Sequence, residues 1–323
     1  MKLPLTGLVA VFFIAACGGA DESPAPTSTT DATEEAVSSR IFDMPYLMRD
    51  LDNGLRVIIV ATDYPDIVTL QTPVQTGSRN EVEAGKSGFA HFFEHMMFRG
   101  TEKYPSDVYS AIRKAAGASS NAYTTDDFTN YYVTFTKPDL EKMIEIEADR
   151  FQNLAYSESD FRTEALAVKG EYLKNYSNPL LKAYERIRAL SFDVHPYSHT
   201  TMGFIEDIEA MPDQIEYSRE FFDRWYRPEY TSIIIVGDVD PEATFDLVEQ
   251  YWGVWERGNY VAEIPEEPPA SGPQYEHIQW EGNTQPWMLL GFRSPAFDPA
   301  EKDFPAMMVL DSLYFSDSSD LYQ

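Results

Sequence analysis

Residues 88–101, Gly-Phe-Ala-His-Phe-Phe-Glu-His-Met-Met-Phe-Arg-Gly-Thr, place two histidines four positions apart within an apolar run. On a helix, residues i and i+4 project from one face, so His91 and His95 can present both imidazoles to one metal ion. Glu94 lies beside that face and can reach a water on the metal without replacing a ligand. The stretch therefore predicts a buried helix that carries a metal site.

The order H-x-x-E-H is the inverted zincin arrangement, in which the carboxylate serves the water and the histidines hold zinc. Zinc lowers the pKa of its water to about 7, and a neighbouring carboxylate can take the proton as the water attacks a carbonyl. The alternative is a pair of structural histidines in an aromatic-rich core. Two of only five histidines in the chain fall into this pattern, which favours the metal site.

A catalytic zinc needs a third protein ligand and one open position. The other histidines, at positions 195, 199 and 277, have no helical partner of this kind. The segment 157–176 is expected to be helical, and its Glu164 and Glu171 are seven positions apart and so lie on one face. Paired glutamates are often a solvated helix face, but the apolar residues 165–168 between them make burial plausible.

The rest of the chain mixes strands and helices without strict alternation, which predicts an α+β fold. We expect a mixed, mainly antiparallel sheet packed against helices. Asn53-Gly54 between two apolar runs predicts a tight hairpin, and Ser157 or Ser159 a helix N-cap. Expected strands are residues 46–48, 55–60, 67–75, 119–125, 130–136, 231–238, 279–280 and 287–292; expected helices are residues 88–98, 105–116, 138–154, 157–176, 180–192, 212–225, 241–254 and 300–315.

The chain of 323 residues has 25 Lys and Arg against 53 Asp and Glu, a formal net charge of −28. Such a surface repels phosphate backbones, so a nucleic-acid partner is not expected. Its 43% hydrophobic content supplies enough core material to exclude global disorder. The single cysteine, Cys17, excludes an intramolecular disulfide.

The N-terminus predicts export. Lys2 precedes an apolar run from Leu5 to Ala16, which is too short to span a bilayer and has the form of a secretory signal. Its end, Ile-Ala-Ala-Cys-Gly, resembles a bacterial lipobox, which implies cleavage after residue 16 and a lipid on Cys17. An ordinary signal peptide or a buried helix is the alternative. We expect a lipoprotein in the cell envelope that faces the periplasm, and Gly18 after the cysteine implies the outer membrane.

Composition also divides the mature chain. Residues 17–44 are expected to form a flexible tether, in which the polar stretch 18–40 alone has a reach of roughly 25–30 Å. Residues 45–260 form the main domain. Residues 261–274 are acidic and rich in Pro, as in a domain linker, and residues 275–323 begin a further unit.

Residues 88–101 resemble the active-site signature of the pitrilysin/insulinase family of zinc metallopeptidases. The similarity continues through Asn130-Tyr131-Tyr132, Asp149-Arg150-Phe151 and Tyr226-Arg227-Pro228 and extends over residues 45–323. The resemblance implies that Glu171, about 75 residues beyond His95, is the third zinc ligand. It also implies that Glu164 orients a ligand histidine, and that Asn121, Ala122 and Tyr123 belong to a strand that binds substrate as an added strand.

The family's implied activity is that of a zinc endopeptidase acting on extended peptides, with one Zn²⁺, His91, His95 and Glu171 as ligands and Glu94 as the base. Family members are built from homologous α+β repeats that close around a peptide, and here the second repeat is expected to be incomplete. We therefore expect metal binding by this chain and hydrolysis that requires a second-half domain or a partner peptidase subunit. The alternative is a non-catalytic, peptide-binding subunit of a two-component peptidase. Subunits of that kind usually lack one of the motif residues, all of which are present here.

Overall fold

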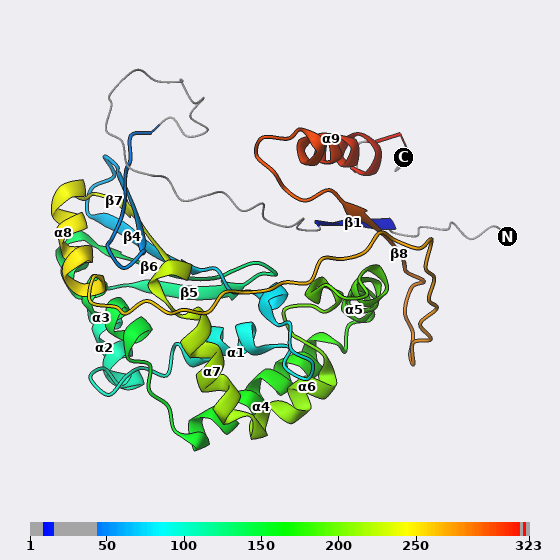
Figure 1. The fold of residues 1–323 in the computed structure, drawn as a ribbon, viewed down its shortest axis with the longest axis horizontal. Helices are drawn as coiled ribbons and strands as arrows, with labels where there is room; N and C mark the ends of the chain where they lie inside the picture. Colours follow the sequence, from blue (N-terminus) through cyan, green and yellow to red (C-terminus); the bar gives the residue numbers. More distant parts are fainter. Residues whose placement is uncertain (1–8, 16–43, 317–318, 321–323) are drawn as a thin grey trace.

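A six-stranded mixed sheet forms the centre of the fold in the computed structural model, which describes residues 9–15, 44–316 and 319–320 (Figure 1). The strand order is β2-β3-β7-β4-β6-β5, and only β3 and β7 run parallel. The predicted α+β fold with a mainly antiparallel sheet is therefore confirmed. The strands are β2 (Leu47–Asp50), β3 (Arg56–Ala61), β4 (Ile67–Val74), β5 (Ser119–Thr124), β6 (Thr129–Thr136) and β7 (Ser232–Gly237).

The hairpin between β2 and β3 forms where the sequence predicts it. Gly54 adopts a φ of 88°, which a residue without a Cβ tolerates. The Asn53 amide donates to the carbonyls of Trp252 and Trp255 at 2.9 and 3.0 Å, so the turn is tied to the end of a distant helix. Along β4, buried and half-buried residues alternate, as expected for a strand with one face on the core.

Helices cover the sheet on one face, where α1, α4 and α7 lie together in Figure 1. Ser157 caps α4 in a capping box with Asp160, which decides between the two predicted caps. The helix α6 and the 3₁₀ turn η1 (Ser78–Asn80) were not predicted. The helices are α1 (Phe89–Met96), α2 (Ser106–Ala115), α3 (Leu140–Gln152), α4 (Glu158–Asn175), α5 (Pro179–Ser191), α6 (Ile205–Ala210), α7 (Ile215–Trp225), α8 (Pro241–Trp252) and α9 (Asp303–Phe315).

The core holds α1 from its apolar side. Phe89, Phe92 and Phe93 are fully buried, and Phe93 stacks on Phe221 of α7 with ring centroids 5.4 Å apart. Phe92 meets Phe161 of α4 edge-on at 5.0 Å. Burial of each such ring stabilises the fold by about 1.5–3 kcal/mol, so α1 is fixed between the sheet, α4 and α7.

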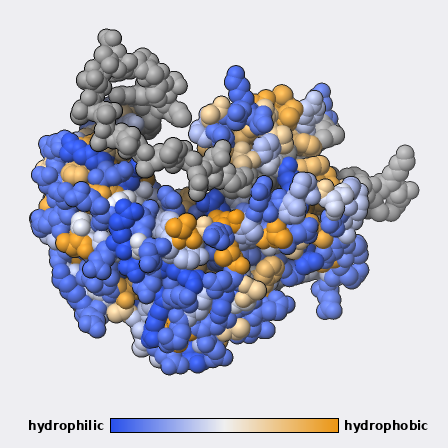
Figure 2. Space-filling view, viewed as in Figure 1, coloured by the Kyte–Doolittle hydropathy of each residue, from blue (hydrophilic) through white to orange (hydrophobic). Residues whose placement is uncertain are grey.

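The last part of the chain packs beside α5 rather than on the sheet. Strand β8 (Met288–Ser294) pairs in parallel with β1 (Val9–Ala15) and contacts α5. Helix α9 exposes Met308, Leu313 and Tyr314, and Figure 2 shows apolar side chains gathered over this region. The predicted cleavage after residue 16 would remove β1 and leave β8 without this partner.

One predicted strand is wrong. Gln279 and Trp280 lie in irregular structure, followed by a bend at residues 281–282. Two residues, followed by a bend that contains Gly282 with a φ of 138°, give too short a ladder to hold a strand. The predicted lipid site at Cys17 lies outside the described residues.

Candidate metal centre

Helix α1 presents its two histidines on the side away from the phenylalanine core. His91 is buried with 7% of its surface exposed, whereas 27% of the His95 side chain is exposed. Their rings lie 4.8 Å apart between centroids and nearly perpendicular to each other. The four-residue spacing thus places both imidazoles at one spot, as the sequence predicts.

Helix α4 brings Glu171 to the same spot. Its Oε2 atom lies 3.7 Å from Nε2 of His91 and 3.5 Å from Nε2 of His95. The ligand atoms of these three residues all lie within 4.8 Å of one another. Within the part of the chain that the structure describes, this is the one such cluster of histidine, cysteine and acidic side chains.

The donor set fits zinc. Ligands placed tetrahedrally at about 2.0–2.1 Å from Zn²⁺ are about 3.3–3.4 Å apart, close to the separations of Glu171 from the two histidines. Two imidazole nitrogens and one carboxylate oxygen are also the ligand types of a catalytic zinc with one open position. With 38% of the Glu171 side chain exposed, solvent reaches the cluster from the side of this residue.

Glu164 fixes the orientation of His95. Its Oε1 atom lies 2.9 Å from Nδ1 of His95, and because a carboxylate accepts, this bond keeps a proton on Nδ1 and leaves Nε2, 3.5 Å from Glu171, as the nitrogen available to a metal. Arg99 donates to the other carboxylate oxygen, from Nε at 2.9 Å and also from Nη2. The hydrogen bond from His95, and then Arg99, lower the pKa of Glu164, and the same bond raises the pKa of His95.

His91 is prepared as a neutral ligand. Burial, and then the neighbouring His95, lower its pKa to about 3, so the imidazole carries no charge at neutral pH. Among the described residues no group bonds to its buried Nδ1 atom. A neutral ring with Nε2 aimed at Glu171 is the form that binds a metal.

Glu94 projects from α1 toward the edge strand. Its Oε2 atom accepts a hydrogen bond of 2.7 Å from the Thr124 hydroxyl at the end of β5. Burial raises the pKa of Glu94, and the Thr124 hydroxyl opposes that rise. A carboxylate with a raised pKa, held beside a metal site, is suited to take a proton from water.

Strand β5 lies at the end of the sheet, with β6 on one side only. Asn121 and Tyr123 are exposed and Ala122 is buried, so the three predicted substrate residues follow the alternation of an edge strand. Helix α1 contacts β5 directly, and the bond between Thr124 and Glu94 joins the two elements. The strand therefore runs next to the histidine cluster.

Sequence reasoning missed Arg99 and Thr124. Both lie inside motif segments, but their partners are 65 and 30 residues away. No sequence periodicity relates positions so far apart. The general rule that a buried carboxylate needs hydrogen-bond donors predicts that Glu94 and Glu164 have such partners, but it does not identify Thr124 and Arg99.

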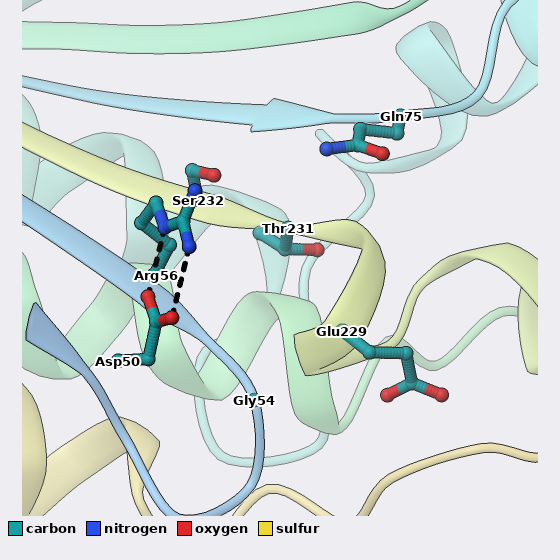
Figure 3. A pocket seen from close by; sticks show the side chains of 7 residues that line it. All are labelled: Asp50, Gly54, Arg56, Gln75, Glu229, Thr231 and Ser232. Carbon is teal, nitrogen blue, oxygen red and sulfur yellow. Dashed lines mark hydrogen bonds and ion pairs between the residues drawn. The ribbon is translucent and has the colours of Figure 1, made fainter. Parts of the chain in front are cut away.

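A separate pocket of about 190 Å³ contributes nothing to this site. It lies between the β2–β3 hairpin and the start of β7, and Figure 3 shows Arg56 paired with Asp50 in its wall. Its lining residues are Asp50, Gly54, Arg56, Gln75, Glu229, Thr231 and Ser232. None of them belongs to the metal cluster.

Two family models match the chain. "Insulinase (Peptidase family M16)" matches residues 56–203, which contain all the candidate site residues except Cys17. "Peptidase M16 inactive domain" matches residues 214–323, from the start of α7 to the end of the chain.

Individual relatives agree with these models. The "Zinc protease PqqE" of Helicobacter pylori is 30% identical over 269 residues, which are 81% of this chain and 59% of the relative. The crystal structure of a protease from Helicobacter pylori superposes with a TM-score of 0.65 at 28% identity, covering 70% of this chain and 55% of that one. The first half of the periplasmic protease PqqL from Escherichia coli gives a TM-score of 0.60 at 25% identity and covers 68% and 49%.

The chain thus spans between 49% and 59% of the length of these three proteins. Both family models, the relatives and the α+β architecture point the same way. The chain belongs to the insulinase family of peptidases, family M16.

Proposed function

We propose that this chain is a zinc-dependent endopeptidase that hydrolyses extended peptides or proteins. The observation that carries the proposal is the convergence of His91, His95 and Glu171 beside a further carboxylate, Glu94, that is not part of the cluster. A relative described as a zinc protease supports it. Family membership alone supports only a peptidase-like function.

In this proposal His91, His95 and Glu171 hold one Zn²⁺. When bound, zinc lowers the pKa of water to about 7 and polarises the peptide carbonyl. Glu94 accepts the proton of the attacking water and passes it to the leaving amine. Thr124 holds the Glu94 carboxylate in place, and Glu164 holds His95 in its ligand tautomer.

The substrate would bind as an additional strand along β5. The unpaired edge offers backbone donors and acceptors, and exposed Asn121 and Tyr123 lie along it. A peptide in this position passes the Glu94 carboxylate, because Thr124 ends the same strand. Backbone pairing recognises extended peptides with little dependence on their sequence.

We further propose that the protein works in the bacterial cell envelope. The PqqL relative is described as periplasmic. The N-terminal signal and the predicted lipid on Cys17 would anchor the protein at the outer membrane, facing the periplasm. No helix in residues 44–316 has the length and apolar character needed to cross a bilayer.

The metal ligands are open to solvent on one side, so hydrolysis is proposed to need a second-half domain or partner subunit that encloses the peptide. An enclosing wall excludes water and contacts the carbonyl oxygen, and one missing contact of this kind costs about 10²–10³-fold. The alternative function, a peptide-binding subunit without catalysis, would bind peptide at β5 but not cleave it.

The test separates metal binding from chemistry. Glu94→Gln should keep zinc and peptide affinity but lower hydrolysis about 10²–10⁴-fold, because the amide cannot accept a proton. Hydrolysis of a fluorogenic peptide is measured for the chain alone and with an added second-half polypeptide of the family. Equal, measurable turnover by Glu94→Gln and the unmodified protein in the presence of the second-half polypeptide would contradict the proposal. Zinc-loaded protein that binds peptide but never cleaves it would favour the alternative.

A further inference from the structure

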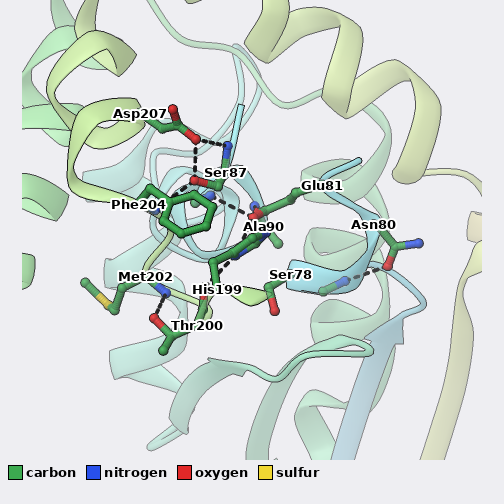
Figure 4. A network of polar contacts seen from close by, with 12 residues as sticks. Ser78, Asn80, Glu81, Ser87, Ala90, His199, Thr200, Met202, Phe204 and Asp207 are labelled. Atoms are coloured by element: carbon green, nitrogen blue, oxygen red, sulfur yellow. Dashed lines mark hydrogen bonds and ion pairs between the residues drawn. The ribbon is translucent and has the colours of Figure 1, made fainter. Parts of the chain in front are cut away.

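The first turn of α1 has an unusual cap. Its N-cap residue is Gly88, which has a φ of 90° and no side chain to satisfy the free N–H groups of the helix. Glu81 supplies the missing acceptors: Oε2 accepts from the Gly88 N–H and Oε1 from the Ala90 N–H, both at 2.7 Å. Figure 4 shows the Glu81 carboxyl group bonded beside Ala90, which directly precedes His91 in the sequence.

Glu81 is built into the interior. Only 4% of its surface is exposed, and His199 Nδ1 lies 3.8 Å from Oε2. A residue that caps for itself would be strained at position 88, because the φ is 90° and a Cβ would lie 2.5 Å from the Ile208 side chain and 3.0 Å from the Met202 carbonyl. At position 88, the cap of α1 is therefore supplied by an acceptor from elsewhere in the chain, the Glu81 carboxyl group.

The turn that carries Glu81 also holds the β5–β6 turn. The N–H groups of Ser78 and Arg79 donate to the carbonyls of Thr125 and Asp126 at 3.3 and 2.9 Å. The Ser78 hydroxyl donates to the Asp126 carboxylate at 2.8 Å. Residues 78–81 therefore join the start of α1 to the end of the predicted substrate strand.

These contacts connect α1 and strand β5 in two ways. One connection runs from α1 through Glu81 and η1 to the turn after β5, and the other returns from Thr124 through its bond to Glu94 of α1. We propose that Glu81 is a positioning residue, which sets His91 and Glu94 relative to strand β5. Glu81 touches neither metal nor substrate and acts only through the backbone of α1.

Substitution of Glu81 by Gln tests this role. In the Gln variant the side-chain oxygen can accept from one of the N–H groups of Gly88 and Ala90, but the side-chain NH₂ group then faces the other. One of the two hydrogen bonds is therefore lost, whether Glu81 itself is charged or neutral. Loss of a helix cap raises the equilibrium constant for local unfolding of the helix end about tenfold. We expect amide hydrogen exchange at Gly88 and Ala90 to become about tenfold faster, and zinc to bind about tenfold more weakly.

The matched control is Glu147→Gln. Glu147 is equally buried, with 1% of its surface exposed, but it bonds to Tyr109 and Arg150, away from α1. This control should lower overall stability without changing exchange at Gly88 or the visible spectrum of the cobalt-substituted protein. Glu81→Gln should change that spectrum, because the ligand geometry shifts. Glu81→Asp, which is one methylene short, replaces the Gln variant if the latter does not fold.

The zinc and cobalt measurements rest on the proposed function, and hydrogen exchange does not. Folded Glu81→Gln with unchanged exchange, zinc affinity and cobalt spectrum would overturn the role of Glu81, as would equal effects of Glu147→Gln. If the unmodified protein binds no zinc, the proposed function fails, while hydrogen exchange in the metal-free protein still decides whether Glu81 fixes α1.

Discussion

Glu164 shows what one side chain does at the residue scale. Its two oxygens serve different partners, Nδ1 of His95 and the guanidinium of Arg99, so the carboxylate is held from both sides. With 11% of its side chain exposed, it is screened little by water. Its effect on His95 is to aim Nε2 at the position shared with His91 and Glu171.

We therefore predict that Glu164→Gln weakens zinc binding by about 10–100-fold while His91, His95 and Glu171 remain in place. Loss of a partner that orients a ligand histidine has this effect in metal sites. Competition with a chromophoric chelator measures the affinity. Glu158→Gln is the control, because Glu158 lies on the same helix with 63% of its side chain exposed and pairs with Arg162. Equal affinities of both variants would contradict the prediction.

At the scale of elements, the site depends on how α1 and α4 begin. Helix α4 starts with an ordinary capping box, Ser157 with Asp160, whereas α1 depends on Glu81 from a distant turn. A local cap is visible in the sequence, and the remote cap is not. The metal site rests on both helices, since α1 carries the histidines and α4 carries Glu164 and Glu171.

The local cap gives a stability prediction. Ser157→Ala removes the acceptor for the Asp160 N–H and should lower the free energy of unfolding by about 1 kcal/mol. Urea unfolding followed by circular dichroism measures the difference. Ser159→Ala is the control, because Ser159 is exposed and lies inside the helix. A larger loss in the control than in Ser157→Ala would show that the helix starts elsewhere.

Glu81 gives a pH dependence at the same scale. Burial raises its pKa to about 8 in the folded protein, with Asp207 and Asp126 adding to the rise and the N–H groups of Ala90 and Gly88 opposing it. The folded state then keeps a proton that the unfolded chain loses above its ordinary pKa of 4.5. This contribution to stability is complete below about pH 4.5 and is lost as the pH rises toward 8.

We therefore expect the stability advantage of the unmodified protein over Glu81→Gln to shrink between pH 5 and pH 8. Urea titrations at several pH values in metal-free buffer measure it, and the difference between the two proteins cancels the titration of other groups, including His199 beside Glu81. An advantage that grows with pH over this range would mean that Glu81 is ionised in the folded state.

At the scale of the whole molecule, one acidic residue fastens the last part of the chain to the main domain. Glu267 lies in the Pro-rich segment, yet only 4% of its side chain is exposed. It accepts hydrogen bonds from the N–H groups of residues 193, 194 and 195 at 2.8–2.9 Å and pairs with Arg293 of β8. The predicted linker is therefore held at this point.

Glu267→Ala should release that segment, because the N–H groups of residues 193–195 and the Arg293 guanidinium lose the carboxylate that joins them to it. We expect limited proteolysis within residues 263–287 to become several-fold faster, with the zinc content unchanged. Glu266→Ala is the control, because Glu266 is the adjacent residue and is exposed. Identical cleavage rates for the two variants would show that Glu267 does not hold the segment.

Periodicity and caps predicted much of the fold. The four-residue spacing of His91 and His95 placed both rings together, and Asn53-Gly54 placed the first hairpin, because each signal is local. Glu171 was reached through family resemblance, since no local pattern joins it to His95. Arg99, Thr124 and Glu81 were missed because each acts on a residue from another element, and the strand at Trp280 was wrong because two apolar residues do not make a ladder.

The central claim is that His91, His95 and Glu171 together hold one zinc ion. Its most direct test is the zinc content of the purified protein after equilibrium dialysis, measured by mass spectrometry beside His91→Ala/His95→Ala, Glu171→Ala and Glu94→Gln. We predict about one zinc per chain in the unmodified protein and in Glu94→Gln, none in the double variant, and a strong loss in Glu171→Ala, because two ligands cannot complete a tetrahedral site. Stoichiometric zinc in the double variant would contradict the account.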